Sequence, residues 1–381
     1  MKLFIFLMLI SQSEGCIICH SEIRNEYTKS IHYKEKVKCD ACHGGDLNAI
    51  DIKKAHHNGF IGKPKRKEII KICSKCHSSP KIMKSYGIPF DQEILYYTSE
   101  HGEAFKRGNE EVALCTDCHG HHEILSSFDK NSRTNILNLP RTCGACHSDF
   151  NMMKKYNISS DVVLEYNLGI HAQKLREGNT NSPTCKDCHG THGATPAGIG
   201  EIEKVCGKCH IKTREYFLKS KHAEFWKELG YGECEICHEN HYVKKASHKL
   251  WKEKCLLCHS KDSKNYKIAE EIYTLFITTQ MEILKTEEII EDLKKIPVSV
   301  EDFLGRIEEA KTYLLEAGPV SHSLKLEEIK SFAIKSKSIA QEVQREGIRR
   351  KKLFESRKLF LPFLWLFILF TISLIIYIRK R

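Results

Sequence analysis

Residues 115–123 read CTDCHGHHE, and the first five of these positions decide the fold because their pattern recurs throughout the chain. Two cysteines separated by two residues and followed at once by histidine occur nine times in 381 residues. The cysteines of the nine motifs are Cys16, Cys19, Cys39, Cys42, Cys73, Cys76, Cys115, Cys118, Cys143, Cys146, Cys185, Cys188, Cys206, Cys209, Cys234, Cys237, Cys255 and Cys258. The histidines that follow them are His20, His43, His77, His119, His147, His189, His210, His238 and His259. The motifs contain all 18 cysteines, so one chemistry accounts for every cysteine in the chain.

The C-x-x-C-H pattern is typical of covalent haem attachment, in which the two thiols bind the porphyrin and the histidine becomes an axial iron ligand. Structural zinc sites also use C-x-x-C pairs, but they consume them two at a time, and nine is an odd number. A disulfide framework explains an even cysteine count but not the nine trailing histidines. We therefore expect nine covalently bound haem c groups.

The beginning of the chain predicts export. Lys2, the apolar run from Leu3 to Ile10 and the small-residue stretch before Cys16 are typical of a signal peptide, which we place at residues 1–15. Haem is attached to c-type cytochromes outside the cytoplasm, so the signal and the motifs agree. The haem domain is therefore expected in the periplasm or another extracytoplasmic space.

The end of the chain predicts a membrane anchor. Residues 359–378 form a 20-residue stretch without a charge, which as a helix matches a bilayer core of about 30 Å. Residues 379–381 are basic and are expected to be a cytoplasmic tail. The protein is thus expected in the cytoplasmic membrane, with a single C-terminal span.

Chain length and charge restrict the fold further. The motifs run from Cys16 to His259, roughly 27 residues for each haem, which is too short a segment to build an apolar core of its own. The expected fold is mainly α with little regular sheet, wrapped around closely packed haems. The net charge of +11 is balanced by haem propionates on this interpretation, and no nucleic-acid-binding signature accompanies it.

An internal repeat supports the packed-haem interpretation. Residues 73–122 align without a gap on residues 143–192, and 19 of the 50 positions are identical. A looser copy continues through residues 222–241. Each unit contains a histidine on an expected short helix, then a C-x-x-C-H motif with a further histidine just after it. Such recurrence predicts that these extra histidines bind iron as well.

Twelve histidines lie outside the motifs, and neighbouring pairs counted once leave ten positions for nine irons. The expected sixth ligands are His32, His56, His57, His101, His122, His171, His192, His222, His241, His248 and His322. Two choices stay open within this set, His56 or His57 and His248 or His322. Methionine, which would raise the potential, is scarce, so mostly bis-histidine haems of low potential are expected.

The three histidines of the opening stretch have different expected roles. His119 is the proximal ligand of the haem held by its own motif. His122 follows three residues later, too close to reach the opposite face of the same iron, so we expect it to bind a neighbouring haem. His121 becomes Thr191 in the repeat, whereas His122 is kept as His192, which makes His121 a bystander.

Beyond the last motif the pattern changes to helical periodicity. Apolar residues share one face of an expected helix over 268–293, Pro297 ends it, and Ser299 is expected to cap a second helix that Gly318 and Pro319 stop. A third helix is expected from about Leu324 into the membrane span. The expected domains are residues 16–262 for the haems, 263–358 for a helical stalk and 359–378 for the anchor.

Particular stretches resemble a known family. Residues 86–109, CTDCHGHHEI at 115–124 and NILNLPRTCGACH at 135–147 are similar to exported multihaem c-type cytochromes with repeated C-x-D-C-H-G-x-H units. These are related to the tetrahaem cytochromes of ammonia oxidisers and to the hydroxylamine oxidoreductase and nitrite reductase superfamily. Residues 314–329 and 345–354 resemble members that stand beside membrane b-type cytochromes. The chain departs from many nitrite reductases in lacking C-x-x-C-K, and from hydroxylamine oxidoreductases in having nine motifs rather than eight.

Two functions are compatible with these features. The resemblance implies electron transfer between a quinol-oxidising b-type cytochrome of the membrane, or another redox protein, and exported electron acceptors. The alternative is an oxidoreductase with one open catalytic haem. We expect the electron carrier, and no catalytic residue is assigned.

Overall fold

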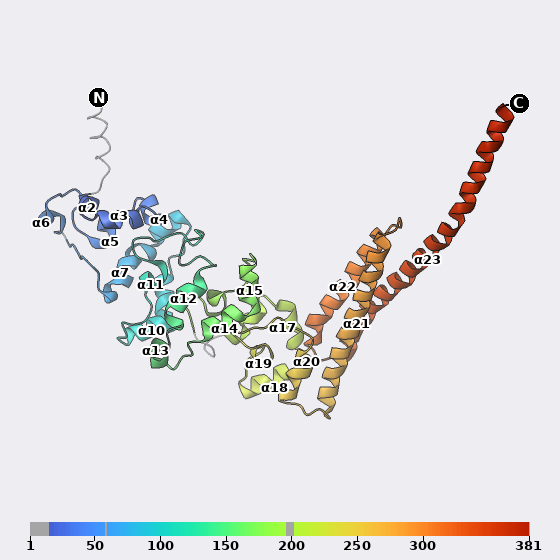
Figure 1. Ribbon diagram of the computed structural model, residues 1–381. Coiled ribbons are helices and arrows are strands. Elements are labelled where there is room, and N and C mark those ends of the chain that lie inside the picture. The colour runs from blue at the N-terminus through green and yellow to red at the C-terminus, as the bar shows by residue number, and fades with distance from the viewer. Residues whose placement is uncertain (1–14, 58, 196–201, 381) are drawn as a thin grey trace. The chain divides into compact units, whose positions relative to one another are not determined.

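The computed structural model describes residues 15–57, 59–195 and 202–380 of the chain. The expected signal peptide at 1–15 lies almost entirely outside these residues. Within them the chain forms helices and turns with no β-strand, and it ends in a long apolar helix (Figure 1). The expectation of a mainly α fold with little sheet is therefore confirmed.

The described chain divides into two compact units. One contains the described residues up to Val205 together with His238–Lys245, and the other contains Cys206–Cys237 and the chain from Ala246 onward. The second unit thus combines thiols of the last three motifs with the long C-terminal helices. The expected boundary between haem domain and stalk at 262/263 stays a prediction.

The first unit is made of short helices joined by loops. Its helices are α2 (Gly15–Cys19), α3 (Ser21–Tyr27), α4 (Ile31–Lys34), α5 (Cys39–His43), α6 (Ile52–Ala55), α7 (Arg66–His77), α8 (Pro80–Met83), η1 (Lys84–Tyr86), α9 (Gln92–Thr98), α10 (Glu100–Lys106), α11 (Cys115–His119), α12 (Leu139–His147), α13 (Phe150–Lys155), α14 (Val162–Leu168), α15 (Ile170–Arg176) and α16 (Cys185–His189). Its largest apolar cluster has only Ile70, Tyr96 and Leu114 fully buried. So small a core agrees with a chain that wraps a cofactor rather than its own side chains.

The sequence repeat is also a structural repeat. Helices α7 to α11 of the first copy correspond in order to α12 to α16 of the second. In both copies the first motif ends a longer helix, a histidine lies on the fourth helix, and the second motif forms a single helical turn. Each motif turn ends at a glycine with positive φ, Gly120 and Gly190, a conformation that glycine adopts without strain.

The second unit begins with short helices and ends in a three-helix bundle. Its elements are η2 (Ile202–Lys208), α17 (Ile211–Phe217), α18 (Lys221–Leu229), α19 (Glu235–His238), α20 (Leu250–Glu253), η3 (Cys255–Leu257), α21 (Lys264–Lys294), α22 (Glu301–Ser321) and α23 (Leu326–Arg379). The buried residues of α21 include Ile272, Phe276, Thr279, Ile283, Thr286, Ile290 and Leu293. These steps of three and four residues give the 3.5-residue period of coiled-coil packing.

Helix α23 contributes small residues to this bundle. Ala333, Ala340 and Gly347 recur every seven residues and are buried against the other two helices. A Cβ placed on Gly347 would lie 3.0 Å from Ile289 and 3.2 Å from Leu293, so α21 and α23 approach closely there. The heptad pattern therefore fixes which faces of the helices meet.

The expected helix ends around α22 are partly wrong. Gly318 and Pro319 do not stop the helix, which continues to Ser321, because Ala317 and Val320 are buried in the bundle and the missing amide of Pro319 falls in the last turn. Ser299 does not cap the helix with its side chain either. Its hydroxyl donates to the carboxylate of Glu301, and Val300 occupies the cap position.

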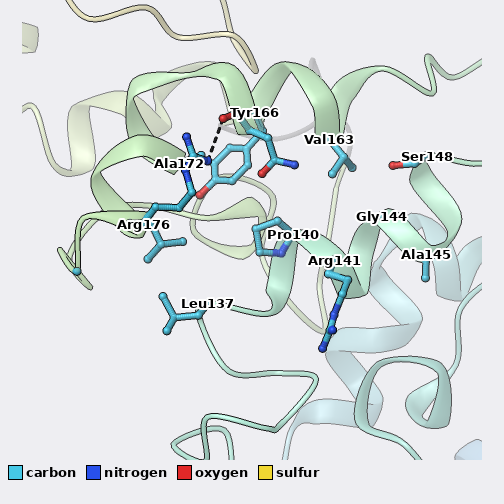
Figure 2. Close-up of a pocket in the computed structure, with 13 residues that line it drawn as sticks. Leu137, Pro140, Arg141, Gly144, Ala145, Ser148, Val163, Tyr166, Ala172 and Arg176 are labelled. Carbon is cyan, nitrogen blue, oxygen red and sulfur yellow. Dashed lines mark hydrogen bonds between the residues drawn. The ribbon is translucent and has the colours of Figure 1, made fainter.

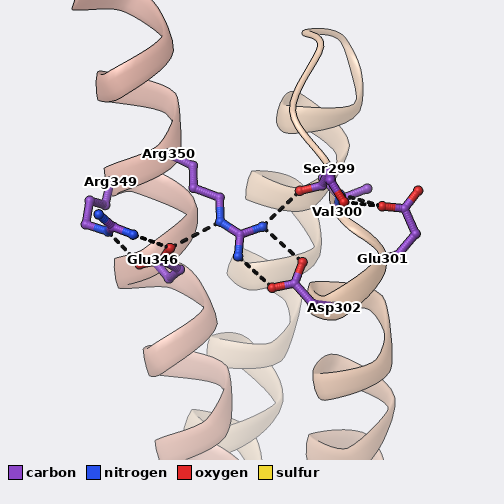
Figure 3. A network of polar contacts seen from close by, with 7 residues as sticks. All are labelled: Ser299, Val300, Glu301, Asp302, Glu346, Arg349 and Arg350. Carbon is purple, nitrogen blue, oxygen red and sulfur yellow. Dashed lines mark hydrogen bonds and ion pairs between the residues drawn. The ribbon is translucent and has the colours of Figure 1, made fainter.

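A polar network joins the start of α22 to α23 (Figure 3). The guanidinium of Arg350 donates to both carboxylate oxygens of Asp302 at 2.9 and 2.6 Å and to the carbonyl of Ser299 at 3.0 Å. Arg350 also pairs with Glu346 on its own helix at 3.1 Å and lies over the ring of Phe303. Such a two-pronged pair fixes the two helices in register more firmly than single exposed ion pairs do.

Helix α23 continues from the bundle into the apolar end of the chain. Its 54 residues make it about 80 Å long, and its most apolar 18-residue window has a mean hydropathy of 2.7. Among the described helices it alone has the length and composition to cross a membrane. It is therefore a candidate membrane anchor.

Candidate functional site

Five of the C-x-x-C-H motifs lie wholly within a helix of the structure. In the α11 turn, for example, Cys115 and Cys118 are three residues apart and therefore lie on the same side, while His119 ends the turn. The same arrangement occurs in α5, at the ends of α7 and α12, and in α16. Cys115 and Cys118 are free thiols, so both sulfur atoms of the α11 turn are available for covalent attachment of a cofactor.

Seven of the motif histidines face a histidine from outside the motifs. Among the described residues the facing pairs, with the distances between ring centres, are His20–His56 at 6.3 Å, His32–His77, His43–His122, His101–His147 and His119–His192 at 6.1 Å, His189–His241 at 5.9 Å and His222–His259 at 6.0 Å. All seven partners are among the expected sixth ligands. Each pair therefore joins one expected proximal ligand to one expected distal ligand.

These separations fit a single iron between each pair of rings. A nitrogen–metal bond of about 2 Å and about 1.1 Å from nitrogen to ring centre, counted on both sides of the metal, sum to roughly 6.2 Å. The observed range is 5.9 to 6.3 Å. The donor set, two imidazoles beside two thiols, also fits a covalently attached haem. The residues present therefore match the requirements of haem c.

The partners follow a simple rule that the repeat explains. We call the motifs at Cys39, Cys115, Cys185 and Cys234 the second motifs. A histidine shortly after a second motif faces the motif histidine two motifs earlier in the sequence. The pairs of this kind are His122 with His43, His192 with His119, and His241 with His189. A histidine that lies on a short helix before a second motif faces the motif histidine of the motif that comes next after that second motif. The pairs of this kind are His32 with His77, His101 with His147, and His222 with His259. Each copy of the repeat thus completes sites in its neighbours.

Several of these rings are oriented through Nδ1. His43 Nδ1 lies 2.8 Å from the carbonyl of Gly62, and His189 Nδ1 lies 3.0 Å from the carbonyl of Thr195. On the other side of the same sites, His122 and His241 place Nδ1 at 3.8 and 3.7 Å from carboxylates of Glu26 and Glu165. A donor bond from Nδ1 leaves Nε2 with the lone pair, which is the usual arrangement of a metal-bound histidine.

Burial keeps many of these histidines neutral. Burial is the main cause that lowers the pKa of His32, His77, His101, His122, His147, His192, His222 and His241. The effect is large for His119, where burial and then the neighbouring His192 lower the pKa to about 4. Neutral imidazole is the form that binds a metal.

Thiols of consecutive motifs lie close together. In the first unit the thiol of Cys73 interacts with that of Cys115, and Cys143 interacts with Cys185. The second cysteines of the other neighbouring motifs also interact electrostatically, Cys42 with Cys76 and Cys118 with Cys146. In the second unit Cys206 interacts with Cys234, and Cys237 interacts with Cys258. Motifs two to six, and separately seven to nine, are therefore spatial neighbours in sequence order.

An aspartate positions the second motif of each copy. Asp117 accepts a hydrogen bond of 2.8 Å from the backbone amide just before Cys115, and Asp187 does the same before Cys185. Arg66 also donates to Asp117. Burial acts to raise the pKa of Asp117, but the hydrogen bonds from Arg66 and the backbone outweigh it and lower the pKa. This is why the second motifs read C-x-D-C-H.

A tyrosine also forms a hydrogen bond with the backbone just before each of these motifs. The hydroxyl of Tyr96 donates to the carbonyl of Ala113 at 2.9 Å, and Tyr166 donates to the carbonyl of Pro183 at 3.0 Å. Burial raises the pKa of Tyr166 to about 12, so the hydroxyl keeps its proton. Sequence reasoning assigned neither tyrosine a role, although the identity of both positions in the repeat was the signal for one.

The remaining histidines are placed as follows. His56 is the member of its neighbouring pair that lies opposite His20. His121 is exposed and lies edge-on to His122; the donor atoms of these two and of Glu26 all lie within 4.8 Å of one another. His248 stacks on Phe276 at 4.4 Å, and His322 follows α22. His171 lies on α15, at the position equivalent to His101 on α10.

A cavity of about 820 Å³ lies between α12, α14 and α15 of the second copy (Figure 2). Its lining includes Pro140, Asn167 and Leu175 and contains no histidine or cysteine. The equivalent residues of the first copy are Ile70, Tyr97 and Phe105, which pack together in the small apolar cluster. The cavity thus lies where the second copy has lost side-chain volume, and no motif histidine opens into it.

Comparison with known proteins agrees with these sites. Part of the chain is similar to the C-type polyheme cytochrome OmcC of Geobacter sulfurreducens, with 27% identity over 221 residues, which is 49% of this chain and 27% of that protein. The chain thus spans about a quarter of the length of that relative. No family model and no solved structure matches the chain. The similarity supports covalently bound c-type haem and a multihaem electron-transfer cytochrome.

Proposed function

We propose that the protein is a membrane-anchored nonahaem c-type cytochrome that carries electrons between a quinol-linked membrane partner and acceptors outside the cytoplasm. The observation that carries the proposal is the set of seven facing histidine pairs, each made of one motif histidine and one partner at a separation that suits one iron. The nine motifs of the sequence extend this count to nine haems.

The chain's residues would hold and isolate these groups. The thiols would attach each haem, and at the seven facing pairs an imidazole from each side would bind the iron, which would leave no coordination site for a substrate at those seven haems. Bound haem iron supplies reversible one-electron transfer. Hydrogen bonds from Nδ1 of His43 and His189 to backbone carbonyls fix the rings and keep Nε2 directed at the metal.

The order of the thiols supports transfer along a chain of sites. Thiols of consecutive motifs from two to six interact within the first unit, and thiols of motifs seven to nine do so within the second. Histidines of neighbouring sites also interact, as His119 does with His77. Closely spaced sites in one order are the arrangement that stepwise electron transfer needs.

The remaining parts of the proposal rest on the C-terminal helices. The apolar end of α23 fits a single membrane span, with the haem region on the extracytoplasmic side. A quinol-oxidising b-type cytochrome or another redox protein is then the partner within reach of the membrane surface. Electron acceptors outside the cytoplasm would meet the haem region.

The alternative, an oxidoreductase with one open haem, has less support. It needs a motif histidine without a partner beside a substrate cavity. The cavity of about 820 Å³ has neither histidine nor cysteine in its lining, so it is not such a site. The seven facing histidine pairs favour the electron carrier.

A stopped-flow experiment tests the proposal. The full-length protein, reduced with dithionite, is mixed with a soluble ferric chelate, and steady-state consumption of nitrite and hydroxylamine is measured separately. The expected result is complete reoxidation of all haems without turnover of either nitrogen compound. Haems that remain reduced, or sustained turnover of nitrite or hydroxylamine, would contradict an electron-carrying chain.

A further inference from the structure

For the haem of the motif at Cys234, the pairing rule points to a histidine beyond the last C-x-x-C-H unit. Trailing histidines complete the site two motifs earlier, so the motif at Cys234 needs a histidine from the chain beyond it. No further C-x-x-C-H unit follows the motif at Cys255. Beyond the paired histidines, that part of the chain offers His248 and His322.

His248 is held by apolar packing. Its ring lies parallel to the ring of Phe276, with the ring centres 4.4 Å apart and an interplanar angle of 13°. Phe276 is 1% exposed and belongs to the core that α21 shares with α22 and α23. Burial alone lowers the pKa of His248, with no other histidine contributing. This is the environment of a half-buried histidine that packs against the core.

His322 has the environment of a ligand. It directly follows α22, and its Nδ1 lies 3.1 Å from the carbonyl of Gly318, as in the oriented rings of His43 and His189. The ring of Trp251 meets it edge-on at 6.4 Å. The carbonyl fixes the ring and leaves Nε2 for a metal.

The neighbours of His322 repeat those of a ligand in the first unit. His192 faces His119 and interacts electrostatically with His77 of the preceding motif, whose first cysteine, Cys73, interacts with Cys115. In the second unit His322 interacts electrostatically with His210 in the same way, and Cys206 of that motif interacts with Cys234. Helix α17, which directly follows His210, packs against α22.

We propose that His322 is the sixth iron ligand of the haem that Cys234 and Cys237 bind, so that the helical bundle supplies part of a redox centre. His248 is then a packing residue. The inference rests on the proposed function in one respect, that the motifs carry haem. The bundle then has a role in haem ligation, because an iron bond would join the end of α22 to the segment that carries Cys234 and Cys237.

The test compares His322→Ala with the matched variant His248→Ala in the full-length protein. Ferric EPR and carbon monoxide titration of the reduced protein count the haems that have lost a ligand. We expect one high-spin, CO-binding haem among nine in His322→Ala, its conversion back to low spin by added imidazole, and spectra of His248→Ala like those of the unmodified chain.

The inference is overturned if His248→Ala produces the high-spin haem, or if neither variant does. A second variant, His322→Met, covers the case in which the alanine variant does not accumulate. Methionine should keep the haem low-spin while raising the potential of one haem, and nine unchanged potentials would overturn the inference. Failure of this inference can be told apart from failure of the proposed function. If the proposed function is wrong, a high-spin, CO-binding haem is expected in the unmodified protein.

Discussion

At the scale of single residues, the second motif of each repeat depends on an acidic side chain that is not itself an expected iron ligand. Asp117 and Asp187 accept the backbone amide that precedes the first cysteine of their motif. They hold the turn in the shape that brings both thiols to one side. Tyr96 and Tyr166 bind the carbonyl one residue further back. Attachment geometry is therefore set by hydrogen bonds to the backbone as well as by the cysteines.

Asp117→Asn should destabilise the protein in a pH-dependent way. The pKa of Asp117 is lower in the folded state than in the unfolded chain, so its contribution is complete above about pH 4 and is lost as the pH falls through the folded value. We expect a loss of about 1 kcal/mol at pH 7 and a smaller difference below pH 3.

Guanidinium unfolding followed by circular dichroism at both pH values measures this difference. Asp40→Asn is the control, because Asp40 also lies in a motif but is exposed. An equal loss at both pH values, or the same loss in the control variant, would contradict the role given to Asp117.

At the scale of elements, the two copies of the repeat have corresponding helices but differ in how far side chains fill the space between them. The first copy fills the space between α7, α9 and α10 with Ile70, Tyr97 and Phe105. The second copy has Pro140, Asn167 and Leu175 at these positions and a cavity of about 820 Å³ beside them. The same backbone plan is thus packed to different degrees.

Leu175→Phe should stabilise the second copy. The larger ring replaces the missing counterpart of Phe105 and buries more apolar surface, which we expect to add about 1 kcal/mol to the free energy of unfolding. Thermal unfolding of the variant is compared with that of Leu164→Phe, which changes a leucine on α14 that is 60% exposed. A lower midpoint for Leu175→Phe than for the control would show that the space is not a vacated core.

The sequence predicts the motifs, the repeat and the long helices well, because each depends on local spacing. The heptad positions of α21 follow directly from Ile272, Phe276 and Ile283. The helix end at Pro319 was wrong because burial of Ala317 and Val320 outweighs the local signal. Which histidines face each other could not be predicted, since partners such as His43 and His122 are distant in sequence and meet only through packing of neighbouring copies.

At the scale of the whole molecule, one chain combines a row of attachment sites with a helical bundle and an apolar helix. The bundle and the apolar segment share α23, a single helix of 54 residues. Arg350 of α23 forms two hydrogen bonds with Asp302 of α22, before the apolar stretch begins. If the apolar stretch of α23 is held in a membrane, the bundle is therefore held at the membrane by the same helix.

Removal of residues 359–381 should release the protein from the membrane. The deleted part contains the apolar window of α23, whose transfer from lipid to water is strongly unfavourable. Haem-stained membrane and soluble fractions measure the change, and deletion of residues 379–381 alone is the control. A truncated protein that stays in the membrane fraction with its haems would contradict the anchor.

The central claim is that every motif carries a haem and that every iron has two histidine ligands. The most direct test is one preparation of the full-length protein in which a pyridine haemochrome count is combined with ferric EPR and carbon monoxide titration. The account predicts nine haems for each chain, low-spin signals only, and no CO binding after reduction. Fewer than nine haems, or a stoichiometric high-spin haem that binds CO, would contradict it.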